Sequence, residues 1–149
     1  MDTSFERLWN RVKCASSEND SAILYGFIRD EQRDAADYAC LACRTCAPNV
    51  RKLLMNLSEE ERRHAKKLQA AAYMLFGEKT ESCEPRYTAH ERMLHALRGM
   101  HSRETEGAEA YSTAAESTSR ESLKTLYREL SKEEQKHAEA LCALLENLL

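Results

Sequence analysis

The sequence predicts an all-α protein, a four-helix bundle built from two repeated helical hairpins. The 149 residues are rich in Ala, Leu, Glu, Lys and Arg, with only 4 Gly and 2 Pro. Strong helix formers are therefore abundant and helix breakers are scarce. The second observation is an internal repeat with an offset of 73 residues (104 − 31). We expect one domain over residues 1–149.

The N-terminal half predicts three helices. A short extra helix is expected over residues 1–15. Asp20 can cap the first bundle helix, which continues to about Cys46. This helix ends there because Pro48 disfavours helical geometry in the residue before it. The second bundle helix runs from about residue 50 to 76 and stops at Gly77, a plausible C-terminal cap.

The C-terminal half predicts the other two bundle helices. Residues 77–88 contain Pro85 and show no periodicity, so they form the linker between the hairpins. The third bundle helix is expected to start after Thr88 and to continue to about Ser117. The fourth runs from about Ser119 to the C-terminus.

The repeat indicates that the two halves are the same hairpin. Two hairpins that cannot bury their apolar stripes alone can bury them against each other. The matched pairs include Glu31 with Glu104, Tyr38 with Tyr111, Leu57 with Leu130, Glu61 with Glu134, His64 with His137, and Leu68 with Leu141.

Each half also places charged residues inside its apolar stripes. Glu61 and His64 share a helix face with leucines that recur every three or four residues, and the fourth helix repeats this pattern. The first and third helices each add one glutamate to an apolar face. The six residues are Glu31, Glu61, His64, Glu104, Glu134 and His137.

Four carboxylates in one core must be protonated, paired with cations or bound to metal. Two divalent ions would supply about +4 of charge, and neutral histidines fit the remaining coordination positions. Glu-x-x-His spacing lets both side chains reach one ion. The alternative is a helical bundle in which these glutamates and histidines lie on the surface. That alternative does not explain why both Glu-x-x-His pairs lie on apolar helix faces.

These residues resemble the ferritin-like di-iron carboxylate proteins, and rubrerythrin in particular. The resemblance covers about residues 20–148, and residues 31–38 look like the first-helix segment of rubrerythrin. It implies that Glu61 and Glu134 bridge two iron ions, for which Mn or Zn can substitute. Glu31 with His64 would then complete one ion, and Glu104 with His137 the other. The same six residues would be the catalytic ones.

Two features depart from the rubrerythrin pattern. Rubrerythrins carry an extra glutamate on the third helix, three residues after the metal-binding glutamate, and this chain has Gly107 there. The equivalent position on the first helix is occupied by Asp34. No pair of Cys-x-x-Cys motifs follows the fourth helix, so we expect an external, rubredoxin-like electron donor.

The resemblance implies a di-iron oxidoreductase, of peroxidase or oxidase type, that acts on peroxide or O2. A ferroxidase or iron-handling protein and a non-catalytic metal-binding bundle remain open. The net charge of -3 and the lack of a basic face argue against nucleic acid. The sequence contains no apolar run of about 20 residues and no signal peptide, so we expect a cytoplasmic protein.

Other polar residues have weaker patterns. Cys40, Cys43 and Cys46 read as small packing residues, with a redox or metal role as the alternative, and Cys14 and Cys142 read as packing residues. His101 reads as a surface residue and alternatively as a neighbour of the site. Tyr38 and Tyr111 are core residues for which a hydrogen-bonding role stays open. His90 and His95 read as solvated.

The linker predicts a homodimer. In ferritin-like bundles the second and third helices are parallel, so the linker must cross about 45 Å. Thirteen steps from Phe76 to Ala89 reach at most about 43–47 Å. Exchange of hairpins between two chains would relieve this strain. Swapped and unswapped dimers both remain open.

Overall fold

The chain folds into four helices that pack as one bundle. The computed structural model describes the backbone of residues 3–81 and 92–148 and, in the first helix, the side chains from Asn19 onward. It confirms the predicted all-α class. The helices are α1 (Thr3–Arg44), α2 (Pro48–Phe76), α3 (Met93–Ser117) and α4 (Glu121–Asn147).

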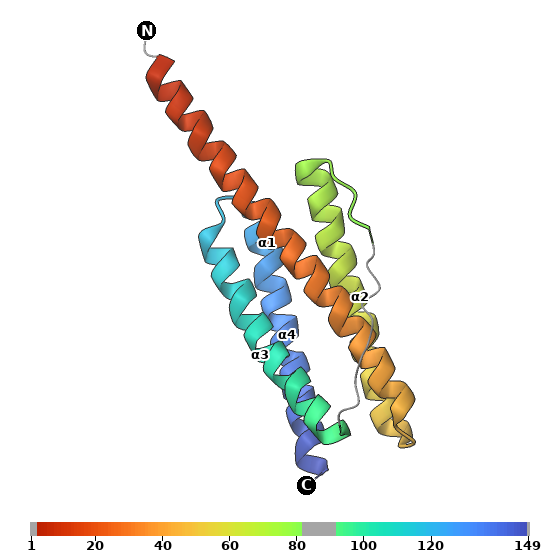
Figure 1. The fold of residues 1–149 in the computed structure, drawn as a ribbon. Coiled ribbons are helices and arrows are strands. Elements are labelled where there is room, and N and C mark those ends of the chain that lie inside the picture. The colour runs from red at the N-terminus through yellow and green to blue at the C-terminus, as the bar shows by residue number, and fades with distance from the viewer. Residues whose placement is uncertain (1–2, 82–91, 149) are drawn as a thin grey trace.

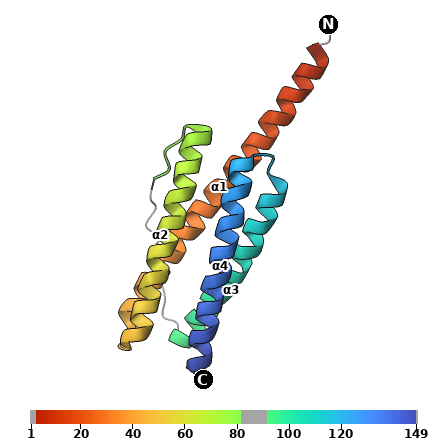
Figure 2. The same cartoon turned by 180° about the vertical axis from the view of Figure 1, so that it is seen from behind.

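Two helical hairpins lie side by side in the bundle. α1 packs along α2 and α3 packs along α4, while α2 faces α4 and α1 faces α3 (Figures 1 and 2). α2 and α3 run in the same direction, as predicted, and the first part of α1 extends beyond the other helices (Figure 1). This arrangement brings the inner faces of all four helices together.

The ends of α2 follow from its sequence. Pro48 occupies the first turn of α2, where its missing N–H is not needed. Gly77 adopts a left-handed conformation (φ 71°) and donates its N–H to the Tyr73 carbonyl at 2.9 Å. The predicted glycine cap is therefore confirmed.

The predicted break between an extra helix over residues 1–15 and a helix capped by Asp20 is wrong. α1 is continuous from Thr3 to Arg44 because the sequence contains no glycine or proline before Gly26. Asp20 instead lies inside α1, with its Oδ2 3.3 Å from Arg120 Nε. The side chains of residues 1–15, including Cys14, lie outside the described residues.

The third helix also begins later than predicted. α3 starts at Met93 and Arg92 has an extended backbone, whereas the sequence suggested residue 89. Residues 77–81 are non-helical, and residues 82–91, with Cys83 and His90, lie outside the described ranges. Seventeen steps (93 − 76) can reach about 56–61 Å, which exceeds the crossing of about 45 Å, so the length of the linker no longer favours hairpin exchange.

Two apolar clusters fill the bundle. Residues of one cluster have their sequence-repeat partners in the other cluster. Leu68 and Tyr111 belong to the first cluster, and their repeat partners Leu141 and Tyr38 belong to the second. Along each helix the clusters lie on opposite sides of the predicted charged residues. The bundle therefore has an approximate two-fold symmetry, and the charged layer lies at its centre. The first cluster comprises Leu24, Ile28, Leu68, Ala72, Tyr111, Ala114, Ala115, Leu123, Tyr127 and Leu130.

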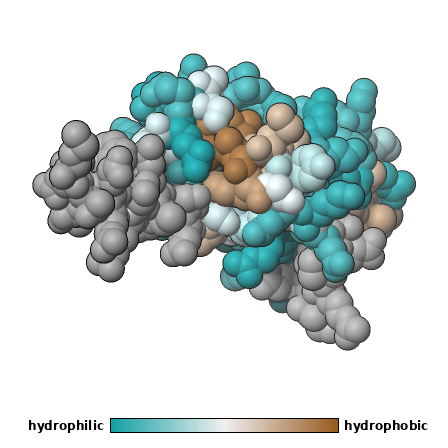
Figure 3. All heavy atoms as spheres, turned by 90° about the horizontal axis from the view of Figure 1, so that it is seen from above, coloured by the Kyte–Doolittle hydropathy of each residue, from teal (hydrophilic) through white to brown (hydrophobic). Residues whose placement is uncertain are grey.

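The end of the bundle from which α1 extends carries an apolar patch. Figure 3 shows this patch in the centre of the end-on view, bordered by hydrophilic residues. Ile23, Leu75 and Phe76 are partly buried members of the first cluster. Among the helices described, none has the length and apolar character that a membrane span requires.

Candidate metal centre

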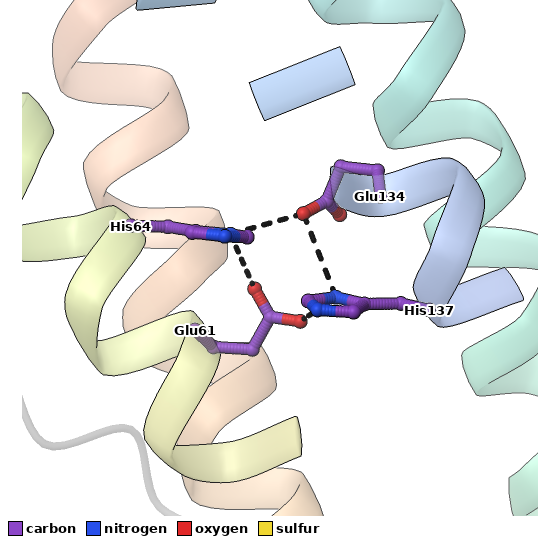
Figure 4. Close-up of side chains that lie close together, drawn as sticks. All are labelled: Glu61, His64, Glu134 and His137. Carbon is purple, nitrogen blue, oxygen red and sulfur yellow. Dashed lines mark hydrogen bonds and ion pairs between the residues drawn. The ribbon is translucent and has the colours of Figure 1, made fainter. Parts of the chain in front are cut away.

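The six residues that the sequence singles out are all buried in the charged layer. Each is at most 4 % exposed. α1 and α3 supply Glu31 and Glu104, and α2 and α4 supply one Glu-x-x-His pair each. Glu61, His64, Glu134 and His137 form the closest group, with one ligand atom of each within 4.8 Å of the others (Figure 4).

One half of the site surrounds His64. Its Nδ1 faces inward and lies 3.2 Å from Glu31 Oε2, 3.1 Å from Glu61 Oε2 and 3.1 Å from Glu134 Oε1. One imidazole nitrogen therefore meets three carboxylates from three helices.

The other half surrounds His137. Its Nδ1 lies 2.8 Å from Glu61 Oε1, 3.4 Å from Glu104 Oε2 and 3.7 Å from Glu134 Oε1. The two oxygens of Glu61 are thus divided between the two imidazoles (Figure 4). This is the position that the bridging role requires.

The outer nitrogens of both histidines meet carboxylates across the bundle. His64 Nε2 lies 2.6 Å from Glu133 Oε2 and His137 Nε2 lies 2.7 Å from Glu60 Oε2. A proton on Nε2 leaves Nδ1 free to accept a metal ion. Glu60 and Glu133 were not predicted as site residues from the sequence, although the repeat pairs them and each directly precedes a site glutamate.

Two buried tyrosines hold the glutamates of α1 and α3. The Tyr38 hydroxyl donates to Glu104 Oε1 and the Tyr111 hydroxyl donates to Glu31 Oε1. Each tyrosine therefore contacts the glutamate of the opposite hairpin. The hydrogen-bonding role that the sequence left open is confirmed.

Burial and mutual contact shift the pKa values of these groups. Burial raises the pKa of Glu134 to about 10, with the charges of Glu31 and Glu61 acting in the same direction against the hydrogen bond from His64. Burial also raises the pKa of Glu31 well above its ordinary value. It would lower the pKa of His137, but hydrogen bonds to Glu104 and Glu61 outweigh it and raise this pKa to about 11.

Glu61 behaves differently from its neighbours. Burial works to raise its pKa, but the adjacent imidazoles of His137 and His64 hold the pKa of Glu61 below its ordinary value. Without metal, these shifts favour a charged Glu61 between imidazolium groups, beside neutral Glu31 and Glu134.

The buried donor atoms suit a pair of metal ions. Four inward atoms meet their neighbours at ion-pair distances but without the geometry of a full hydrogen bond among the described residues: Glu61 Oε1, Glu104 Oε2, Glu134 Oε1 and His137 Nδ1. Buried polar atoms without full hydrogen bonds are costly, and these four face one another. Carboxylate and imidazole donors suit iron, manganese and zinc. The residues therefore fit the group that the sequence predicts.

The positions beside the site differ between the halves. Asp34 lies 3.0 Å from Arg103 Nη1 and 3.2 Å from Arg33 Nε, and burial raises its pKa to about 6 against these charges. At the mirror position, a Cβ on Gly107 would lie 3.2 Å from Glu134 Oε2. Gly107 thus leaves the space that the Glu134 carboxylate uses.

The described cysteines stay outside this cluster. Cys43, Cys46 and Cys142 are exposed, so the packing role expected for them is wrong, while Cys40 is half-buried. The three exposed thiols lie near the ends of α1 and α4. His101 is half-buried and His95 is exposed.

A cavity of about 450 Å³ opens over the two imidazoles between α2 and α4. Its walls combine the outer carboxylates with three cations. The lining residues are Glu60, Arg63, His64, Lys67, Glu133, Lys136 and His137.

The fold and the carboxylate–histidine cluster define a ferritin-like metal protein. The rubrerythrin family model matches residues 23–145, and the chain belongs to that family. A hypothetical protein from Pyrococcus furiosus has a similar structure, with a TM-score of 0.72 and 23 % identity over 85 % of this chain and 88 % of that one. This likeness concerns the fold alone. No curated protein sequence matches the chain.

Proposed function

We propose that the protein is a di-iron, or Fe/Mn, oxidoreductase that reduces peroxide or O2 with electrons from an external donor. The observation that carries the proposal is the division of Glu61 between His64 and His137, 3.1 Å and 2.8 Å away. A carboxylate in this position can bridge two ions, and membership of the rubrerythrin family supports the same assignment.

Glu31, Glu61, His64 and Glu134 would hold one ion, and Glu61, Glu104, His137 and Glu134 the other. Two iron ions bound there would supply the two electrons that reduce peroxide to water. The side chains would fix the ions in a layer that lies between two apolar clusters, which keep bulk water from reaching it along the bundle axis. Tyr38 and Tyr111 keep Glu104 and Glu31 in place through the oxygens that face away from the histidines.

The proposal is tested by peroxide consumption. Iron-loaded, reduced protein is mixed with peroxide, and iron oxidation and peroxide loss are followed together. We expect one peroxide consumed for each pair of irons oxidised, and no reaction of the metal-free protein. Peroxide loss that is equal with and without iron would contradict the proposal. Accumulation of thousands of irons per particle would favour iron handling, and metal-dependent melting without redox cycling a structural role.

A further inference from the structure

Tyr111 is connected to two further aromatic rings on the side away from the candidate metal centre. The Phe27 ring stacks on Tyr111, with centroids 4.1 Å apart, and meets the Tyr127 ring edge-on at 5.3 Å. The rings of Tyr111 and Tyr127 are 5.9 Å apart. The Tyr111 hydroxyl also donates to Glu31. A continuous chain of contacts therefore runs from Glu31 through Tyr111 and Phe27 to Tyr127.

The other half of the bundle lacks this continuation. The repeat places Met100 opposite Phe27 and Leu54 opposite Tyr127. Both of these residues pack in the same cluster as Tyr38. Tyr38 therefore makes the same hydrogen bond to a site glutamate as Tyr111 but is followed by aliphatic side chains. Two equivalent tyrosines thus have different surroundings.

Tyr127 has a hydroxyl that packing alone does not explain. The residue is 1 % exposed, and its hydroxyl has no hydrogen-bond partner in the described part of the chain. A phenylalanine would fill the same space without leaving a buried donor unpaired. The negative charge of Asp20 acts on this hydroxyl. Asp20 in turn lies 3.3 Å from Arg120, whose side chain is 35 % exposed, so the path ends near the surface.

We propose that Tyr111, Phe27 and Tyr127 form a one-electron relay between the metal site and the protein surface. The inference rests on the proposed peroxide chemistry. Phenols are oxidised by one electron more readily than aliphatic groups, and rings in contact allow the electron to pass. The relay would act when peroxide meets a site that holds only one reducing electron.

The electrons and protons balance as follows. Peroxide takes one electron from the site and one from Tyr111, and with two protons it becomes two waters. The Tyr111 phenolic proton moves to Glu31 Oε1 along their hydrogen bond. Tyr127 then gives an electron to the Tyr111 radical, which recovers its proton from Glu31. The Tyr127 hydroxyl has no direct hydrogen-bond acceptor among the described residues, so its proton passes through an intervening water to the Asp20 carboxylate. An external one-electron donor, with the proton held by Asp20, restores Tyr127.

The relay is tested by electron paramagnetic resonance on iron-loaded protein. Protein given one electron per site is mixed with peroxide and frozen, and a second sample is fully reduced first. We expect a tyrosyl radical in the first sample and none in the second, because the fully reduced site supplies both electrons. Ring-deuterated tyrosine should narrow the signal. Oxidation of the iron without a radical would overturn the relay, whereas iron that peroxide does not oxidise would refute the proposed function itself.

Three conservative variants locate the radical. Tyr111→Phe should reduce its yield at least tenfold. With an external donor present, Tyr127→Phe should lengthen the lifetime of the radical at least tenfold, because the Tyr111 radical then loses the residue that supplies its electron. Tyr38→Phe is the matched comparison, because it removes the same kind of hydrogen bond to a site glutamate without removing a relay residue. Its radical yield per bound pair of irons should fall far less than that of Tyr111→Phe. Equal losses in Tyr38→Phe and Tyr111→Phe would overturn the relay. Melting temperatures show whether each variant is folded, and Tyr127→Phe removes only an unpartnered hydroxyl.

Discussion

Glu133 Oε2 on α4 lies 2.6 Å from His64 Nε2 on α2, so the imidazole of one hairpin is fixed by a carboxylate of the other. Glu60 and His137 repeat this contact in the opposite sense, at 2.7 Å. Both contacts therefore join α2 of one hairpin to α4 of the other, beside the candidate metal centre. Orientation of the histidines therefore depends on how α2 and α4 are packed.

Loss of one outer carboxylate should weaken metal binding. We expect Glu133→Ala to lower the affinity for one of the two ions by about 10–100-fold, because His64 loses the acceptor that orients it. Glu129→Ala is a matched control, since Glu129 is on the same helix and bonds the surface residue Lys67, at 2.7 Å. Metal titration followed by calorimetry measures both variants. Equal affinities in the two would show that Glu133 does not position His64.

A methyl group at Gly107 should disturb the site. The Cβ of Gly107→Ala would meet Glu134 Oε2 at 3.2 Å and force this carboxylate to move. We expect weaker metal binding and little or no gain in stability. Gly99→Ala, on the same helix with open space around it, should instead stabilise the protein by about 0.5–1 kcal/mol. Metal titrations and melting curves compare the two. Unchanged metal affinity in Gly107→Ala would mean that Glu134 can shift freely.

The metal-free protein should lose stability as the pH rises. Groups with raised pKa values stabilise the fold below their unfolded pKa and lose this effect as the pH rises through the folded pKa. For Glu134 the window runs from 4.5 to about 10, and for His137 from 6.5 to about 11. Glu61, with a lowered pKa, acts oppositely and loses its contribution as the pH falls below 4.5.

Melting temperatures of metal-free protein should therefore decline above about pH 4.5 and more steeply above about pH 6.5, where His137 adds its contribution. Metal ions need deprotonated ligands, so loading at neutral pH should release protons and remove this decline. Calorimetry in buffers of different ionisation enthalpy counts the protons released. A melting temperature that is the same from about pH 5 to about pH 9 without metal would argue against the protonated cluster.

One chain should be able to complete the site. Because all six residues meet within a single chain and the linker is long enough, we expect mixed Glu61→Ala and Glu134→Ala chains to regain no intact site. Metal analysis of the mixture tests this, and recovery of metal binding would reveal exchanged hairpins. The homodimer stays a prediction, which light scattering on the metal-loaded protein tests.

The sequence predicted the residues whose positions follow from helical periodicity and the repeat. Glu61 and His64 stand on an apolar face, so their burial and meeting with the second half could be inferred. Glu60 lies at the edge of that face, where a glutamate reads like any solvated residue. Its contact with His137 depends on the distance between α2 and α4, which periodicity does not determine.

The register of the apolar stripes was also predicted only approximately. The spacing of the apolar stripe, counted back four residues from Leu130, places Leu126 in the core of α4. In the structure Tyr127 and Leu123 are buried and Leu126 is partly exposed. Neighbouring positions differ by about 100° around a helix, so a small rotation selects between them. The aromatic contact between Tyr111 and Tyr127 was therefore invisible before α3 and α4 were placed together.

Metal content per chain tests the central claim most directly. Protein purified from an iron-supplied host should carry two ions per chain, and its optical spectrum should identify them as iron. Glu61→Ala should lose both ions together, because Glu61 faces both histidines, while His137→Ala should lose one preferentially. A wild-type chain without bound metal, or a Glu61→Ala chain that keeps two ions at unchanged affinity, would contradict the account.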